Sequence, residues 1–260
     1  MSEHWLLFDV GNTHTVAGLF RASGERLAEA RFRTDPQCTA DEYRSALRQL
    51  FFEQLRANVW ELTGRVVMST VVPPLEAVLR DAAKGGPSPI PFLAVNNRLK
   101  RDFELDLPFP DQLGADRLAN VAGALTLVEP PLLIVDAGTA TTFCLLDQRC
   151  AYIGGAIVPG LETSWKALQS RAAKLFSVEL RRPASSLGNT TELQLQSGVL
   201  HGYEALIEGL ADRLLRDAGF TQATLLATGG CLNLIELSGR FRREPDLTLL
   251  GLFRYGQLNG

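Results

Sequence analysis

The sequence predicts a mixed α/β protein made of two related halves. A strand ending in Asp-x-Gly, a small polar turn and a second strand occur twice, starting at Leu6 and at Leu132. Strand-like and helix-like segments alternate along the rest of the chain, as in α/β folds. A repeated unit of this kind indicates two similar halves. With the proline pair 130–131 as linker, we expect an N-terminal domain over 1–129 and a C-terminal domain over 130–260.

The first repeat, "LLFDVGNTHT", has two interpretations. Gly11 and Asn12 both tolerate positive φ, so the segment is compatible with a simple tight turn between two strands. The second copy, "LLIVDAGTATTFCLLD", favours more than a turn. Direct alignment pairs the following residues of the two copies: Asp9 with Asp136, Gly11 with Gly138, Thr15 with Thr142, and Leu19 with Leu146.

The composition of the two turns suits phosphate binding. Glycine lets backbone approach a ligand, and exposed turn N–H groups with threonine hydroxyls can surround phosphate oxygens. An aspartate at the strand end can hold a hydrated divalent cation that neutralises those phosphates. We therefore expect the two hairpins to hold a nucleoside triphosphate tail between them. The chain contains neither GxxxxGK[ST] nor GxGxxG, which excludes a P-loop and a dinucleotide fingerprint.

Between the repeats, a capping box at 39–42 predicts a helix that continues with apolar residues at helical spacing to Leu55. The other elements expected in this half are a strand over 66–72, a helix through Leu75 and Leu79 ending at Gly85-Gly86, a strand over 90–95, a loop over 100–113 and a helix over 118–127.

After the second repeat, we expect a helix over 204–218 that Gly219 ends, and a strand over 225–228 that enters Gly229-Gly230. Two glycine stretches have open interpretations. The run 154–160 and the pair after Thr228 either serve packing or let backbone approach a ligand. At 229–230 that ligand would be a nucleoside at a helix start.

Composition limits the class of protein. The 260-residue chain has a net charge of −3 and a pI near 5.7, which argues against a dedicated nucleic-acid or anionic-membrane binder. Glu129 and two prolines interrupt the longest apolar stretch, so no membrane span is expected. The N-terminus lacks a signal-peptide pattern. Four scattered cysteines indicate free thiols in the cytoplasm, and the three histidines lack metal-ligand spacing.

The run Gly114-Ala115-Asp116-Arg117 precedes the apolar face of the helix predicted over 118–127. Asp116 is compatible with an N-cap that accepts backbone N–H bonds. It is equally compatible with a general base, next to an arginine that binds the carboxylate of an anionic substrate. One carboxylate can do both if only one of its oxygens caps the helix.

Taken together and in order, five motifs resemble the type III pantothenate kinases, in the acetate/sugar kinase, heat-shock ATPase and actin superfamily. The motifs lie at 9–13, 114–117, 136–142, 154–160 and 228–230, and "LTLLGL" resembles the family's ending. The resemblance implies two ribonuclease-H-like (actin-like ATPase) domains facing each other across a nucleotide cleft, and a homodimer. It also implies ATP-dependent phosphorylation of pantothenate to 4′-phosphopantothenate, the first step of coenzyme A biosynthesis.

The resemblance also implies roles for individual residues. Asp9 is expected to position Mg²⁺, and Asp136 to bind a monovalent cation, K⁺ or NH₄⁺. The expected ATP-binding residues are Asp9, Val10, Gly11, Asn12, Thr13, His14, Thr15, Val16 and Thr139. The expected pantothenate-binding residues are Gly114, Ala115, Asp116, Arg117 and Thr191, with Thr190 as the alternative to Thr191 and with Asp116 as catalytic base.

The chain departs from the family at Leu107, seven residues before Gly114, where many members have a substrate-contacting tyrosine. Phe109 can supply an apolar contact instead. The alternatives to a pantothenate kinase are a kinase for another small hydroxy acid, a polyphosphate-directed phosphatase, a transcription accessory factor and an inactive nucleotide-binding scaffold. The Gly-Ala-Asp-Arg run disfavours the first two. The acidic pI disfavours direct DNA contact, and three retained aspartates disfavour the scaffold, although a fold alone guarantees no activity.

Overall fold

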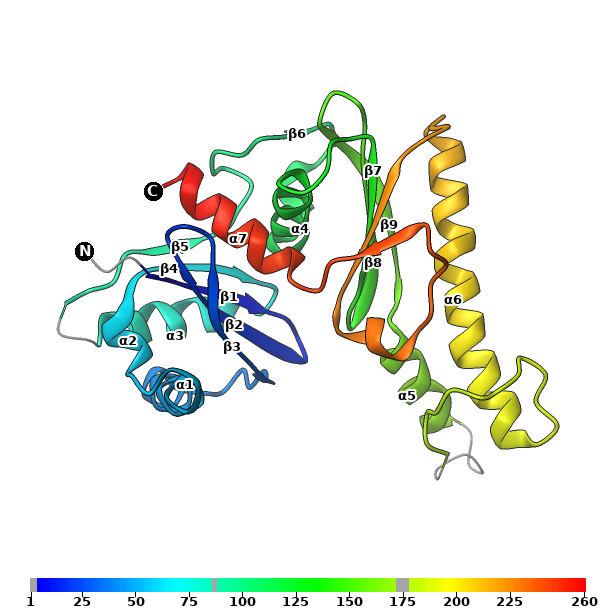
Figure 1. Cartoon of the computed structure of the whole chain (residues 1–260), viewed down its shortest axis with the longest axis horizontal. Coiled ribbons are helices and arrows are strands. Elements are labelled where there is room, and N and C mark those ends of the chain that lie inside the picture. The colour runs from blue at the N-terminus through cyan, green and yellow to red at the C-terminus, as the bar shows by residue number, and fades with distance from the viewer. Residues whose placement is uncertain (1–3, 86–87, 172–177) are drawn as a thin grey trace. The chain divides into compact units, whose positions relative to one another are not determined.

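The computed structural model describes residues 4–85, 88–171 and 178–260. Its elements group into two compact units. The first unit contains the chain up to Asp102, Pro108–Leu127 and Asp246–Gly260, and the second contains Phe103–Leu107 and Val128–Pro245 (Figure 1). All four cysteines are free thiols, as expected.

The first unit is built on a five-stranded sheet in the order β3-β2-β1-β4-β5. β2 is antiparallel to β1 and β3, whereas β4 is parallel to β1 and β5. The strands are β1 (His4–Val10), β2 (His14–Arg21), β3 (Arg26–Arg33), β4 (Thr63–Thr70) and β5 (Phe92–Ala94). The helices of this unit are α1 (Ala40–Leu55), α2 (Val59–Leu62), α3 (Pro73–Lys84), α4 (Ala115–Leu125) and α7 (Leu247–Leu258), with a 3₁₀ turn, η1 (Pro110–Gln112).

Alternate residues of β1 face different helices. Leu6, Phe8 and Val10 join a buried cluster with apolar residues of α1 and α3. Trp5, on the other face, packs against Phe253 of α7 with the two rings tilted and their centroids 4.8 Å apart. Because successive strand residues point to opposite faces, Asp9 lies on the face opposite α1 and α3.

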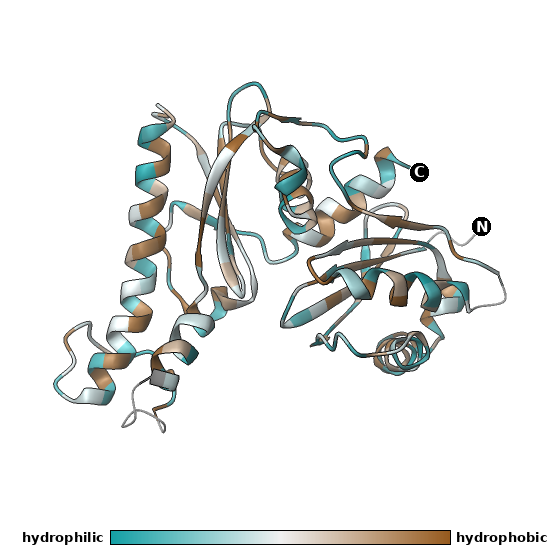
Figure 2. Ribbon diagram, turned by 180° about the vertical axis from the view of Figure 1, so that it is seen from behind, coloured by the Kyte–Doolittle hydropathy of each residue, from teal (hydrophilic) through white to brown (hydrophobic). Residues whose placement is uncertain are grey.

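The second unit contains a six-stranded sheet in the order β11-β10-β7-β8-β9-β6. Its strands are β6 (Glu104–Leu105), β7 (Leu132–Ala137), β8 (Ala140–Leu146), β9 (Ala151–Pro159), β10 (Thr224–Thr228) and β11 (Phe241–Arg243). Its helices are α5 (Leu161–Arg171) and α6 (Thr191–Asp217), with a 3₁₀ turn, η2 (Gly230–Leu234). Leu200, Tyr203 and Ile207 of α6 join the buried cluster of this sheet. Figure 2 shows mixed teal and brown along α6, as expected for a helix with one apolar face.

The two sheets have the same topology, which confirms the predicted repeat. β7, β8, β9, β10 and β11 occupy the positions that β1, β2, β3, β4 and β5 occupy in the first sheet, with the same parallel and antiparallel pairings along β1–β4 and β7–β10. This confirms the mixed α/β class with two similar units. β6 is an addition, paired with β9 at the sheet edge.

The chain crosses between the two units more often than the single boundary expected at 129/130. The C-terminal helix α7 belongs to the first unit, where it packs closely on α4. A Cβ on Gly251 would lie 1.7 Å from Ala119 O, and one on Gly123 would lie 2.2 Å from Leu247 O. The buried Asn120 accepts a 2.7 Å hydrogen bond from Thr248 Oγ1. The C-terminal "LTLLGL" segment therefore completes the first unit.

Local predictions differ from the structure mainly at element ends. The capping box at Thr39 and Glu42 is present. The helix predicted over 204–218 begins at Thr191, because Thr190 caps it there. The loop expected over 100–113 contains β6 and η1. Gly86, half of the expected stop after α3, lies outside the described residues. No described helix is long and apolar enough to cross a membrane.

Candidate active site

The first hairpin turns through Gly11, Asn12 and Thr13. Asp9, beside this turn, accepts a 2.9 Å hydrogen bond at Oδ1 from Ser69 Oγ of β4. Thr34 holds the turn from the end of β3: its Oγ1 donates to Gly11 O at 2.7 Å, and its N–H donates to Thr13 O at 3.0 Å. The turn is thus fixed by side-chain and backbone bonds from a neighbouring strand.

A buried polar cluster lies behind this first hairpin. Thr15 is fully buried, and its Oγ1 lies 2.9 Å from Thr34 Oγ1. The Tyr43 hydroxyl of α1 is buried beside Thr15 without a hydrogen bond of acceptable geometry to any described residue. Burial raises the pKa of Tyr43.

The second hairpin has a shorter turn, Gly138 and Thr139. Thr139 O accepts bonds from Thr163 Oγ1 at 2.7 Å and from Gly160 N at 3.1 Å, so the start of α5 holds this turn. A Cβ on Gly160 would lie 2.2 Å from Gly138 O. Gly160, the last residue of the predicted glycine run, therefore serves close packing against the turn.

Asp136 lies beside the strand-to-glycine junction of β10. Thr228 is its parallel neighbour in the sheet, and Gly229 follows with φ +100°. A Cβ on Gly229 would lie 2.5 Å from Asp136 Oδ1 and 2.6 Å from the backbone of Ala137. The backbone of Gly229 therefore lies directly against the Asp136 carboxylate, where no side chain fits.

The buried threonine of the second hairpin is Thr141, which hydrogen-bonds the Tyr203 hydroxyl of α6. Burial raises the pKa of Tyr203, and the bond to Thr141 opposes that shift. α1 comes before β4 and after β3, and α6 comes before β10 and, with α5 between them, after β9. Tyr43 and Tyr203 thus lie on helices at comparable places in the two units.

Strand register corrects the alignment of the repeats by one residue after the turn. Thr15 pairs with Val10, and Thr141 pairs with Ala137. Thr15 therefore corresponds to Thr141 rather than to Thr142, and Leu19 corresponds to Leu145 in the same way. The reason is the extra residue in the first turn, which a gap-free alignment cannot accommodate.

Of the two interpretations of Asp116, the N-cap is wrong. Gly114 is the N-cap of α4 and supplies no side-chain bond, and Asp116 lies within the first turn of the helix. A Cβ on Gly114 would lie 2.4 Å from Asp116 Oδ1, so glycine leaves room for the carboxylate. Arg117 Nη2 donates to Gln112 O at 3.3 Å. The side chains of Asp116 and Arg117 are both partly exposed.

Thr190 and Thr191 have different roles at the start of α6. Thr190 is the N-cap of α6, and its Oγ1 accepts a 3.2 Å bond from Leu193 N. Thr191, the first residue of the helix, is exposed. Because Thr190 already caps the helix, Thr191 stays the better candidate for a substrate contact. Phe109, named as a substitute contact, is 68% exposed.

The expected site residues are divided between the two units. Residues 9–16 and 114–117 belong to the first unit, whereas Asp136, Thr139 and Thr191 belong to the second. The sequence did not identify Ser69, Thr34 or Thr163 as supports of the two turns. Ser69 and Thr70, polar residues inside the strand predicted over 66–72, were the available signal, because β4, which contains them, pairs in parallel with β1.

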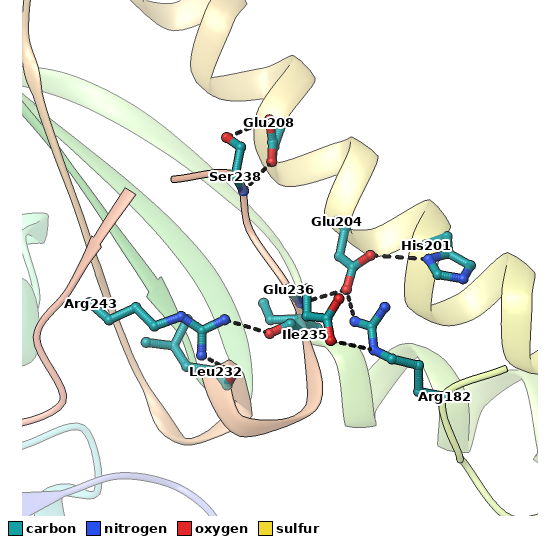
Figure 3. Close-up of polar contacts among 9 residues, drawn as sticks. All are labelled: Arg182, His201, Glu204, Glu208, Leu232, Ile235, Glu236, Ser238 and Arg243. Carbon is teal, nitrogen blue, oxygen red and sulfur yellow. Dashed lines mark hydrogen bonds and ion pairs between the residues drawn. The ribbon is translucent and has the colours of Figure 1, made fainter. Parts of the chain in front are cut away.

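A network of charged residues holds the segment after Gly230 against α6 (Figure 3). Glu204 accepts bonds from Glu236 N at 2.6 Å, from Arg182, and from His201 Nδ1 across 3.2 Å. Burial would raise the pKa of Glu204, but these donors outweigh it and the pKa is lowered. Glu208 accepts bonds from Ser238 N and Oγ at 2.8 and 3.1 Å. This network fixes the expected nucleoside region at its far end.

The two aspartates differ in the ions that are expected at their carboxylates. No group of three or more His, Cys, Asp or Glu residues within the described ranges is arranged to hold a metal. A single carboxylate such as Asp9 fits Mg²⁺, which keeps several waters and takes other ligands from substrate phosphates. Asp136 likewise offers carboxylate oxygens, the type of ligand that K⁺ or NH₄⁺ would need.

A matching family model and two similar curated proteins all belong to one enzyme family. A model of the type III pantothenate kinase family matches residues 5–213. The chain is 37% identical over 256 residues to a type III pantothenate kinase of Brevibacillus brevis, covering 95% of this chain and 96% of that protein. It is 38% identical over 249 residues to one of Exiguobacterium sibiricum, covering 95% and 96%.

Among solved structures, similarity extends over the whole fold at low sequence identity. A Baf family protein of Campylobacter jejuni has a TM-score of 0.59 at 18% identity, with 97% of each chain covered. Component A of the (R)-2-hydroxyglutaryl-CoA dehydratase of Acidaminococcus fermentans has a TM-score of 0.57 at 13% identity, with 100% of each chain covered. These two likenesses concern the fold alone.

Proposed function

The chain belongs to the type III pantothenate kinase family, and on this premise we propose that it transfers the γ-phosphoryl group of ATP to pantothenate. The product is 4′-phosphopantothenate, the first intermediate of coenzyme A biosynthesis. The observation that carries the proposal is family similarity over 95% of the chain, combined with two Asp-x-Gly hairpins at the same position of two equivalent sheets.

In the proposed reaction, both hairpins bind the triphosphate of one ATP. The turn at Gly11–Thr13 and the turn at Gly138-Thr139 offer backbone N–H groups and threonine hydroxyls to phosphate oxygens. Each turn is held by bonds from outside its own hairpin, so it needs little rearrangement when charge develops on the transferring group. Bound Mg²⁺ would neutralise phosphate charge, with Asp9 as its protein ligand or as the acceptor for its water.

The substrate run at the start of α4 supplies the remaining chemistry. Asp116 accepts the proton of the pantothenate hydroxyl as that oxygen attacks the γ-phosphorus in line with the leaving oxygen. Arg117 binds the pantothenate carboxylate, because a guanidinium matches that group with two parallel bonds. Thr191 adds a hydroxyl contact. No covalent enzyme intermediate is formed.

Three further expectations belong to this proposal. Asp136 binds K⁺ or NH₄⁺, the active form is a homodimer, and the enzyme works in the cytoplasm. Size-exclusion chromatography with light scattering would test the second; a monomer at micromolar concentration would contradict it.

A product assay tests the function. Purified protein is incubated with MgATP and pantothenate in sodium or potassium buffer, and 4′-phosphopantothenate is quantified by mass spectrometry. A panel of other small hydroxy acids serves as the specificity control. We expect product with pantothenate and more of it in potassium. Product with another acid but none with pantothenate would overturn the substrate assignment.

Asp116→Asn tests the mechanism. We expect kcat to fall by about two to four orders of magnitude, the usual contribution of a general base. The melting temperature should change little, because the Asp116 side chain does not cap α4. Asp217→Asn, at an exposed carboxylate near the end of α6, is the control and should retain activity. Near-normal turnover of Asp116→Asn would exclude Asp116 as the base.

A further inference from the structure

The proposed ATP site lacks a permanently charged cation. Residues 9–16, Asp136 and Thr139 include no lysine or arginine. A transferring phosphoryl group develops charge on its oxygens, and phosphoryl-transfer enzymes commonly place Lys or Arg beside the metal ion to stabilise it. Within the first unit, the register of the sheet identifies a source of positive charge that the motifs do not contain.

Arg31 of β3 lies on the same face of the sheet as Asp9. Asp9 pairs with Val16 of β2, and Val16 pairs with Arg31. Residues directly opposite each other in neighbouring strands point to the same face. Two strand spacings put the Arg31 backbone about 10 Å from that of Asp9. Only the partly exposed Val16 stands between them in this row.

Arg33 lies on the same face, one position nearer the turn. It pairs with His14, the first residue of β2 after the turn. Phe32, between the two arginines, packs on the opposite face, where its ring contacts Tyr43 of α1 with centroids 5.9 Å apart. The alternation of the strand therefore directs Arg31 and Arg33 away from α1 and onto the face of Asp9.

The two arginines differ from others in the same hairpins. Arg21 pairs with Glu25, and Arg26 pairs with both Glu29 and Asp246. Arg31 and Arg33 are exposed, and across the ranges 4–85, 88–171 and 178–260 neither forms an ion pair. Their guanidinium groups are thus not engaged by a described carboxylate.

We propose that Arg31 and Arg33 bind the phosphate oxygens of ATP and stabilise the charge that develops during transfer. The inference rests on the proposed function and adds a cationic pair to its ATP site. Arginine suits this position, because its planar group can bind two phosphate oxygens at once and stays charged at every working pH.

The test compares Arg31→Gln, Arg33→Gln and Arg31→Lys with Arg48→Gln. Arg48 is an exposed arginine of α1, which packs on the opposite face of the sheet, so its loss changes net charge equally. We expect Arg31→Gln and Arg33→Gln to raise the KM for ATP at least tenfold and to leave the KM for pantothenate within twofold. Arg31→Lys should recover part of the loss, and Arg48→Gln should match the wild type.

A second readout does not depend on turnover. Mg²⁺ with inorganic tripolyphosphate should raise the melting temperature of the wild type and of Arg48→Gln, but raise it much less in the two Gln variants. If the wild type is stabilised but phosphorylates no pantothenate, the proposed function fails while the phosphate-binding role stands.

Three results would overturn the arginine proposal. They are an unchanged KM for ATP in both Gln variants, an equal change in Arg48→Gln, and equal tripolyphosphate stabilisation of all four variants. Should Arg31→Gln melt below the wild type without ligand, Arg31→Lys and Arg33→Gln carry the test, since lysine keeps the charge and an aliphatic stem.

Discussion

The two hairpins occupy the same place in two sheets of the same topology, yet their aspartates have different surroundings. Asp9 accepts a hydrogen bond from the Ser69 hydroxyl. Asp136 instead faces Gly229, where any side chain would clash with its carboxylate. The same backbone plan thus supports two carboxylates in different environments, which accords with the proposal that they serve different cations.

The support behind the hairpins differs as well. The Thr15 hydroxyl hydrogen-bonds the Thr34 hydroxyl, whereas the Thr141 hydroxyl hydrogen-bonds the Tyr203 hydroxyl. The tyrosine on the helix corresponding to α6, Tyr43, has a buried hydroxyl without such a bond. The comparison shows that a repeated fold can retain the position of a buried threonine while its partner changes.

The largest expected effect comes from removing the charge of Asp9. Asparagine keeps the size of the side chain and can still accept the Ser69 bond, so Asp9→Asn should fold normally. We expect kcat/KM for MgATP to fall by about 10²–10³, the scale of one lost electrostatic contact in a transition state. Steady-state kinetics at several Mg²⁺ concentrations measures it. A loss confined to potassium buffer would mean that Asp9 and Asp136 have exchanged roles.

Asp136→Asn should have a smaller and different effect. If Asp136 binds the monovalent cation, the variant loses the stimulation by K⁺ or NH₄⁺ and keeps its activity in sodium. Activity titrated with KCl at constant ionic strength checks this. A wild type that works equally in sodium and potassium would remove the proposed difference between the two hairpins.

Gly229→Ala tests the close packing of Gly229 against Asp136. Its φ of +100° disfavours any L side chain, and the new Cβ would meet Asp136 Oδ1 and the Ala137 backbone. We expect a loss of about 1–3 kcal/mol in the free energy of unfolding, measured by urea denaturation. Thr70→Ala is the matched control, because Thr70 follows Ser69 as Gly229 follows Thr228. It removes the bond from Val72 N and should cost about 0.5–1.5 kcal/mol.

Phe substitutions at the two tyrosines should have unequal effects on stability. Tyr203→Phe breaks the buried bond to Thr141 and should cost about 1 kcal/mol, whereas Tyr43→Phe removes a hydroxyl without a satisfactory partner and should be neutral or stabilising. The midpoint of urea unfolding measures both. Equal destabilisation would show that Tyr43 forms an equivalent bond in solution.

The smallest expected effect concerns the pH dependence of stability, to which Tyr43 and Tyr203 should contribute in the same direction. Burial raises the pKa of Tyr43 and of Tyr203 in the folded protein. Above about pH 10, an unfolded tyrosine loses its proton while the folded one keeps it, so stability falls as pH rises. Each tyrosine adds a slope of at most about 1.4 kcal/mol per pH unit. Either Phe variant should flatten the decline between pH 9.5 and about 11, and an unchanged slope would contradict the shift.

The sequence by itself determined the features that depend on local chemistry. Turn residues and strand periodicity identified both hairpins, and Thr39 and Glu42 identified the start of α1. Each of these signals lies within a few residues, where turn and capping preferences act directly on the backbone.

Tertiary structure decided which distant residues meet at those features. It placed Ser69 beside Asp9, Gly229 beside Asp136, Tyr203 beneath Thr141 and α7 on α4, and it shifted the repeat alignment by one residue. It also showed that Gly114, not Asp116, caps α4. Cross-strand register and helix docking bring together residues up to about half the chain apart, and their energies depend on the packing of many side chains at once. No local pattern encodes such pairings, which is why only the sheet register shows Arg31 on the face of Asp9.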